Sequence, residues 1–124
     1  LAFRVDDAAE RFEAIYLRPT NGRAQSQALR NHATQYIASP EWGWRRLREE
    51  EPFRYEAYVD LEAGAWTRVR VELDGRRARL FVHGAPEPTL VVDLKHAPSE
   101  GGLALWVGPG TVAHVADVTV TPAR

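Results

Sequence analysis

The densest group of polar and aromatic side chains lies in residues 30–36, which read Arg-Asn-His-Ala-Thr-Gln-Tyr. Polar side chains beside aromatic rings are typical of sugar sites, because amides bind hydroxyls and a ring covers the C–H face of a pyranose. If the segment is a strand, alternation separates two faces: Arg30, His32, Thr34 and Tyr36 on one, and Asn31, Ala33, Gln35 and Ile37 on the other. Equally, His32 and Gln35 would satisfy buried backbone groups of neighbouring strands.

A second candidate region is the loop Ala38–Pro52, which carries Trp42 and Trp44. Long ordered loops on a β scaffold often hold binding sites. The plainer interpretation, favoured because aromatic side chains bury large areas wherever they find room, is that Trp44 covers the edge of the core. The predicted carbohydrate-binding residues are Arg18, Asn31, His32, Gln35, Tyr36, Trp44 and Arg48.

Each of these residues has an expected role toward a sugar. Trp44 and Tyr36 would stack on sugar rings, and Asn31 and Gln35 would bind hydroxyls. The guanidinium groups of Arg18 and Arg48 would hold a polar or acidic substituent through paired hydrogen bonds.

Catalytic carboxylates are the pattern to seek in a glycosidase. Laminarinase-type enzymes carry the acids on one strand as E-x-D-x-x-E, and the nearest stretch here is Tyr58–Glu62. Tyr58 stands in place of the first acid, and Ala63 in place of the last, so no catalytic residue is assigned. A hydrolase would have to use His32 with Glu13 or Glu56 as acid and base.

Metal and cofactor signatures are weak. The four histidines do not stand at ligand spacing, and the chain has no cysteine, so zinc is not expected. Calcium would need oxygen ligands in a spaced loop, which the scattered aspartates do not form: Asp6, Asp7, Asp60 and Asp93. We predict no metal and no cofactor.

Composition indicates an ordinary globular domain. The 124 residues are 44% hydrophobic and 27% charged, with a formal net charge of -1. This balance gives no reason to expect nucleic acid as a partner, and no stretch is apolar enough to span a membrane. The chain contains no methionine and opens on an apparent strand, Leu1–Val5. We therefore expect these residues to have been cut from a longer protein.

The periodicity predicts β structure throughout. Alternation in Trp66–Leu73, the turn dipeptide Asp74-Gly75 and renewed alternation to His83 predict a hairpin over Trp66–Gly84. A short helical turn is expected at Trp44–Glu50. Other expected strands are Leu1–Val5, Phe12–Arg18, Ala28–Ile37, Thr89–Leu94, Leu103–Val107 and Thr111–Thr121. Turn signals spaced by roughly ten residues favour one all-β sandwich domain over residues 1–124.

The order of several motifs resembles a known family. These are Phe12–Pro19, Arg30–Ile37, Trp44 with Leu47-Arg48, Leu80–Gly84, Glu87–Val92, Gly102–Gly108 and the closing Val118–Val120. The series resembles the keto-disaccharide-hydrolase-like domains, a bacterial branch of the laminin-G-like and concanavalin A-like jelly rolls. Family domains carry extra strands before the segment matching Leu1–Val5, so the chain is expected to lack its N-terminal strands. His83 replaces the asparagine usual in that turn.

The resemblance implies an antiparallel two-sheet jelly roll of the concanavalin A-like lectin/glucanase type, with one concave face. It also implies a link to carbohydrate and favours a periplasmic or secreted location. The leading hypothesis is thus a carbohydrate-binding or carbohydrate-associated module. The alternatives are a hydrolase of glycosides of modified (3-keto) sugars, and a structural or protein-interaction domain of a larger enzyme.

Overall fold

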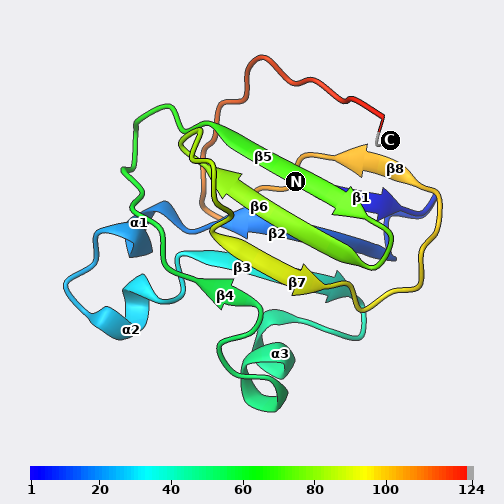
Figure 1. Ribbon diagram of the computed structural model, residues 1–124, viewed down its shortest axis with the longest axis horizontal. Coiled ribbons are helices and arrows are strands. Elements are labelled where there is room, and N and C mark those ends of the chain that lie inside the picture. Colours follow the sequence, from blue (N-terminus) through cyan, green and yellow to red (C-terminus); the bar gives the residue numbers. More distant parts are fainter. Residues whose placement is uncertain (123–124) are drawn as a thin grey trace.

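The computed structural model describes residues 1–122, which form two antiparallel sheets joined by a common core (Figure 1). One sheet has five strands in the order β4-β3-β2-β1-β8, and the other has three in the order β5-β6-β7. The strands are β1 (Ala2–Val5), β2 (Phe12–Leu17), β3 (Thr34–Ser39), β4 (Glu56–Ala57), β5 (Val69–Asp74), β6 (Arg77–Val82), β7 (Leu90–Asp93) and β8 (Gly102–Ala104). The prediction of an all-β, two-sheet fold is confirmed.

Three short helices complete the described chain: α1 (Pro19–Gly22), α2 (Gln27–Arg30) and α3 (Trp44–Glu50). The helical turn expected at Trp44–Glu50 is therefore present. Among residues 1–122, no helix is both long and apolar enough to cross a bilayer.

The β5–β6 hairpin forms where the sequence predicts it. Val69 pairs with Val82, Asp74 pairs with Arg77, and Gly75 takes the positive φ of 59° that the tight turn requires. The strand begins at Val69 rather than at Trp66, whose side chain is 76% exposed. The alternation directs Val71 and Leu73 of β5 toward the core.

At the other end of β6, His83 adopts a left-handed φ of 62° and is followed by Gly84 at 68°. Glycine tolerates this region best, and histidine is among the non-glycine residues that enter it more often than most. The imidazole Nε2 of His83 lies 2.5 Å from the carbonyl oxygen of Asp60, so the turn is tied to the segment after β4.

The expected strand over Ala28–Ile37 is wrong in its first half, because residues 27–30 form α2 and β3 begins only at Thr34. Local hydrogen bonds favour the helical turn: Ser26 Oγ caps it by accepting from the amide of Leu29 at 3.4 Å. The Arg30 guanidinium donates to the carbonyl of Ala24 at 2.6 Å. Arg30, Asn31 and His32 therefore do not alternate with the strand residues that follow.

The C-terminal prediction is also corrected. β8 covers only Gly102–Ala104, and the expected strand at Thr111–Thr121 is not formed. This segment is rich in valine and threonine, but β propensity produces a strand only where a neighbour supplies hydrogen bonds. Residues 105–122 pair with no described strand, and Val112, Val118 and Val120 are exposed. Trp106 is held differently, because its ring centroid lies 4.8 Å from that of Tyr16.

The core contains a buried carboxylate. Glu13 is 0% exposed among apolar side chains of both sheets. The Arg4 guanidinium donates to Glu13 Oε2 at 3.1 Å and to the carbonyl of Gly75 at 2.8 Å. Arg4 has a φ of 51° within the irregular β1–β8 pairing. Because Gly75 lies in the β5–β6 turn, Arg4 bridges the two sheets.

Tyr36 completes this network from β3. Its hydroxyl donates to Glu13 Oε1 at 2.5 Å and accepts from the backbone N–H of Lys95 at 2.9 Å. Burial and then the bond to Glu13 raise the pKa of Tyr36, so the phenol stays protonated and donates. Since Lys95 follows β7, this hydroxyl is a second link between the sheets.

We expect Tyr36→Phe to destabilise the fold, because it leaves a carboxylate oxygen and an amide without their shared partner. The free energy of unfolding should fall by about 1 to 3 kcal/mol in urea titrations. Tyr55→Phe is the matched control, since the Tyr55 hydroxyl makes only a 3.2 Å bond to the Asp93 carbonyl. Its loss should be about 1 kcal/mol or less. Equal losses for both variants would contradict the role given to Tyr36.

Candidate functional site

Strand register gathers polar side chains on the face of the five-stranded sheet opposite the core. Tyr16 pairs with Gln35, and Gln35 pairs with Glu56, so their side chains lie side by side across β2, β3 and β4. Inward-facing neighbours such as Ile15 and Tyr36 belong to the core. This outer face is where the candidate site is built.

Arg18, just after β2, holds the cluster together. Its Nη2 donates to Gln35 Oε1 at 3.0 Å and to the Tyr16 hydroxyl at 3.2 Å. Its Nη1 donates to Glu56 Oε1 at 3.2 Å and to the backbone carbonyl of His32 at 2.9 Å. One guanidinium thus fixes the strand residues, the carboxylate and the segment leading into β3.

Glu56 is the centre of charge in the site. Its side chain is 5% exposed, and Arg48 from α3 grips it with two donors, Nε to Oε2 at 2.9 Å and Nη2 to Oε1. Burial by itself raises the pKa of the Glu56 carboxyl, but the bonds and charge of Arg48 outweigh burial. The charges of His32 and Arg18 act in the same direction, and the pKa is lowered. Glu56 is therefore an ionised acceptor at neutral pH.

His32 lies against this carboxylate without a formed hydrogen bond. Its Nδ1 is 3.1 Å from Glu56 Oε1, within ion-pair distance. The same nitrogen is buried and has no hydrogen-bond partner among the described residues, because distance alone does not align an N–H with its acceptor. The imidazole of His32 is thus close enough to interact electrostatically with Glu56, while its Nδ1 has no hydrogen-bond partner among the described residues.

A pocket of about 450 Å³ opens beside this cluster, which is within the size range of small-ligand sites. Its lining residues come from α2 and the segment after it, from α3, and from Pro52 to Glu56 at the start of β4. Its lining combines polar with apolar side chains, and Phe53 is 80% exposed with a left-handed φ of 67°. The lining residues are Ala28, Asn31, His32, Arg48, Pro52, Phe53 and Glu56.

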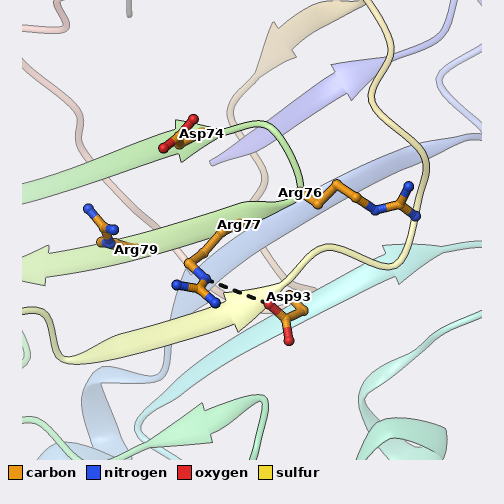
Figure 2. Close-up of a pocket in the computed structure, with 5 residues that line it drawn as sticks. All are labelled: Asp74, Arg76, Arg77, Arg79 and Asp93. Atoms are coloured by element: carbon orange, nitrogen blue, oxygen red, sulfur yellow. Dashed lines mark ion pairs between the residues drawn. The ribbon is translucent and has the colours of Figure 1, made fainter.

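A second, shallower hollow of about 290 Å³ lies at the β5–β6 turn (Figure 2). Its lining is wholly charged: Asp74, Arg76, Arg77, Arg79 and Asp93. Arg77 Nε lies 3.7 Å from Asp93 Oδ1, and Figure 2 shows Arg76 extending away from the other four side chains. With no aromatic ring and none of the predicted residues, this hollow is a weaker candidate for a sugar site.

The structure brings three of the predicted ligand residues into the larger pocket, namely Asn31, His32 and Arg48. Arg18 does not line the pocket, but it donates a hydrogen bond to the lining residue Glu56. Trp44 begins α3 outside the pocket and is 40% exposed. The guanidinium carbon of Arg48 lies 4.8 Å from its ring centroid. Trp44 thus supports a pocket residue rather than lining the pocket.

Two predicted roles are corrected. Tyr36 is fully buried on the core side, so its ring offers no face to a sugar. Gln35 is fully buried too: its amide donates to the Tyr36 carbonyl at 2.8 Å, and its oxygen accepts from Arg18. Backbone satisfaction, the alternative raised for Gln35 from the sequence, is what the structure shows.

Phe53 and Glu56 are pocket residues that were not among the predicted ligands. From the sequence, Glu56 is a candidate only for the acid or base of the hydrolase alternative. For Phe53 the available signal was a lone aromatic in Pro52-Phe53, directly after the acidic run Glu49–Glu51. A phenylalanine in so polar a segment is expected to stay exposed instead of entering the core. An exposed aromatic ring is a candidate for contact with a ligand.

Within residues 1–122, no group of three or more histidine or acidic side chains is placed to hold a metal ion. Comparison of the chain with protein-family models, with curated proteins and with solved structures finds no match.

We predict that Glu56→Gln removes a pH-dependent part of the stability. A carboxyl whose pKa is lowered on folding stabilises the protein above its unfolded pKa, about 4.3, and loses this contribution as the pH falls through its folded value. At pH 7 the variant should lose about 1 to 3 kcal/mol of unfolding free energy. Below pH 5 the difference from the parent should shrink.

The measurement is urea unfolding at a series of pH values. Glu49→Gln is the control, because Glu49 is exposed and makes no ion pair with a described residue. If Glu56→Gln and Glu49→Gln follow the same acid profile, the Arg48–Glu56 pair does not set the stability of this site.

Proposed function

We propose that the chain is a carbohydrate-binding or carbohydrate-associated sandwich module, with the sugar bound in the pocket between α2, α3 and β4. The observation that carries the proposal is a pocket whose lining combines an exposed aromatic ring, Phe53, with the hydrogen-bonding side chains of Asn31 and Arg48. Sugars need both surfaces, because one side of a pyranose presents C–H groups and its rim presents hydroxyls.

The exposed side chain and left-handed backbone of Phe53 are both unfavourable for the free energy of folding. A phenylalanine in water forgoes burial, and a left-handed backbone at a non-glycine residue costs on the order of 1 to 3 kcal/mol. Such outliers concentrate where a surrounding structure holds them for a purpose. A ligand that covers the ring would recover part of the hydrophobic free energy.

Two polar residues of the lining have donors that no described residue uses. Asn31 Oδ1 accepts from Gln27 at 2.7 Å, while its Nδ2 makes no hydrogen bond to a described residue. Arg48 uses Nε and Nη2 on Glu56 and leaves Nη1 without a bond in the described chain. These donors suit hydroxyl or carboxylate oxygens of a sugar. Arg18 supports the lining by holding the His32 carbonyl and Glu56 in place.

Hydrolysis of a modified sugar is the second candidate, favoured by the 3.1 Å contact between His32 Nδ1 and Glu56 Oε1 in the pocket. An ionised carboxylate beside an imidazole can orient that ring as a general base. Glu13, the other carboxylate considered, lies on the core face and is fully buried, so it cannot reach the pocket. Turnover of a chromogenic 3-keto-glucoside, lost in His32→Ala, would support this alternative.

We expect Phe53→Ala to weaken binding of a sugar found by screening a glycan panel. Loss of one stacking ring should reduce affinity by about fivefold to tenfold in isothermal titration calorimetry. Asn31→Ala should give a comparable loss by removing a hydroxyl partner. Trp66→Ala is the matched control, since Trp66 is a similarly exposed aromatic outside the pocket lining.

If no glycan of the panel binds, the result would favour the hypothesis that the chain is a structural or protein-interaction domain. Binding that Phe53→Ala and Trp66→Ala leave equally intact would show that the sugar sits elsewhere, and the pocket assignment would be abandoned.

A further inference from the structure

The edges of the two sheets are unequal. At the edges of the sheets, β4 has two residues, β8 three, β7 four and β5 six. β5 also contains no proline and no register shift, which are common devices for blunting an edge. Within residues 1–122, β6 is the one strand that pairs with β5, so the other side of β5 is an open edge.

The hydrogen-bonding groups on that edge can be assigned from the hairpin. The amide of His83 donates to the carbonyl of Arg68 at 2.9 Å, so the backbone of Arg68 is directed toward the β6 side. Alternation then directs the even-numbered residues of β5 to β6 and the odd-numbered ones outward. Val69, Val71 and Leu73 therefore present their N–H and C=O groups to the open edge.

The side chains of β5 are self-complementary. Arg70 and Glu72 lie on the outer face of the sheet, across from Phe81 and Arg79 of β6, and Val69, Val71 and Leu73 lie on the inner face. If two copies of β5 pair antiparallel about a two-fold axis at Val71, Arg70 of each faces Glu72 of the other. One step further out, Arg68 faces Asp74.

Other two-fold registers match the charges less completely. Centring the pair on residue 70 makes two Arg68–Glu72 pairs but sets Arg70 against Arg70, and centring it on residue 72 makes two Arg70–Asp74 pairs but sets Glu72 against Glu72. A shift to residue 69 sets Arg68 against Arg70, and a shift to residue 73 sets Glu72 against Asp74. Like charges directly opposite are destabilising in a sheet, so the sequence of β5 specifies the Val71-centred register.

We propose that a second copy of this chain binds to the open edge of β5, in a two-fold antiparallel pairing centred on Val71. The two three-stranded sheets become one sheet of six strands. The outward backbone groups of Val69, Val71 and Leu73 are then hydrogen-bonded. On the inner face, Val69, which is 45% exposed, gains Leu73 of the other copy as a neighbour. This dimer is independent of the proposed sugar pocket, which lies beside the other sheet.

The segment of residues 111–122 is the competing occupant of this edge. It runs on the same side of β5 in Figure 1, yet it makes no backbone hydrogen bond to that strand. Its charged side chains do not alternate in a pattern that matches Arg70 and Glu72. The charge pattern therefore favours a second β5 over this segment.

The test uses opposite charge reversals in the full chain, followed by sedimentation velocity over a range of concentrations. The parent should show a concentration-dependent dimer. Arg70→Glu sets two carboxylates against each other across the axis, and Glu72→Arg sets two guanidinium groups against each other. Each variant alone should therefore dimerise at least about tenfold more weakly. Mixed together, the two variants face each other with opposite charges, and the mixture should recover the parental affinity.

Val71→Cys tests the register, since the parent has no cysteine. Residue 71 faces itself at the axis, so this variant should form an intermolecular disulfide on mild oxidation. Val69→Cys, which faces Leu73, should form far less. A parent that stays monomeric at all concentrations overturns the proposal, as do single variants that do not recover on mixing. Equal cross-linking of the two cysteine variants, or an edge occupied by residues 111–122 of the same copy, overturns it as well.

Discussion

A carboxylate enclosed in an apolar core is the constraint on which much of this structure depends. An ion without partners in such a place would be several kcal/mol unfavourable, so the chain must bring partners to Glu13. Arg4 leaves regular β geometry to reach it, and Tyr36 faces inward to donate to it. The same two side chains hold the β5–β6 turn and the segment after β7, which keeps the two sheets in one relative position.

The inward direction of Tyr36 also determines the outer face. Because side chains alternate along β3, placing Tyr36 in the core places Gln35 on the opposite side, under the guanidinium of Arg18. From there a line of hydrogen bonds continues to Glu56 and on to Arg48 of α3. The pocket wall is therefore an extension of core packing, and its polar groups are positioned by strand register rather than by loop flexibility.

The sequence predicts the parts of this fold that depend on local chemistry. Asp74-Gly75 between alternating segments is sufficient for the β5–β6 hairpin, and the alternation of Gln35 and Tyr36 is also correct. The sequence does not show which side of β3 faces the core, because both faces of this strand carry large polar or aromatic side chains. The role given to Tyr36 failed for this reason, whereas the role given to Gln35 failed because Arg18 and the backbone carbonyl of Tyr36 already use its amide. The strand expected at Thr111–Thr121 failed because a strand requires a partner, and propensity does not supply one. Phe53 was missed because its exposure depends on how the turn after α3 leaves the core.

The pairing of β1 with β8 has a consequence for how the chain acquires its structure. Ala2 lies beside Ala104, so β1 leaves the ribosome long before the strand that completes its side of the sheet. The hairpin of β5 and β6 can close as soon as it is made, whereas among the described strands β1 pairs early with β2 and much later with β8. Contacts so distant along the chain slow folding and lengthen the time during which unpaired edges are exposed. During synthesis the side of β1 that pairs with β8 therefore has to wait for residues 102–104.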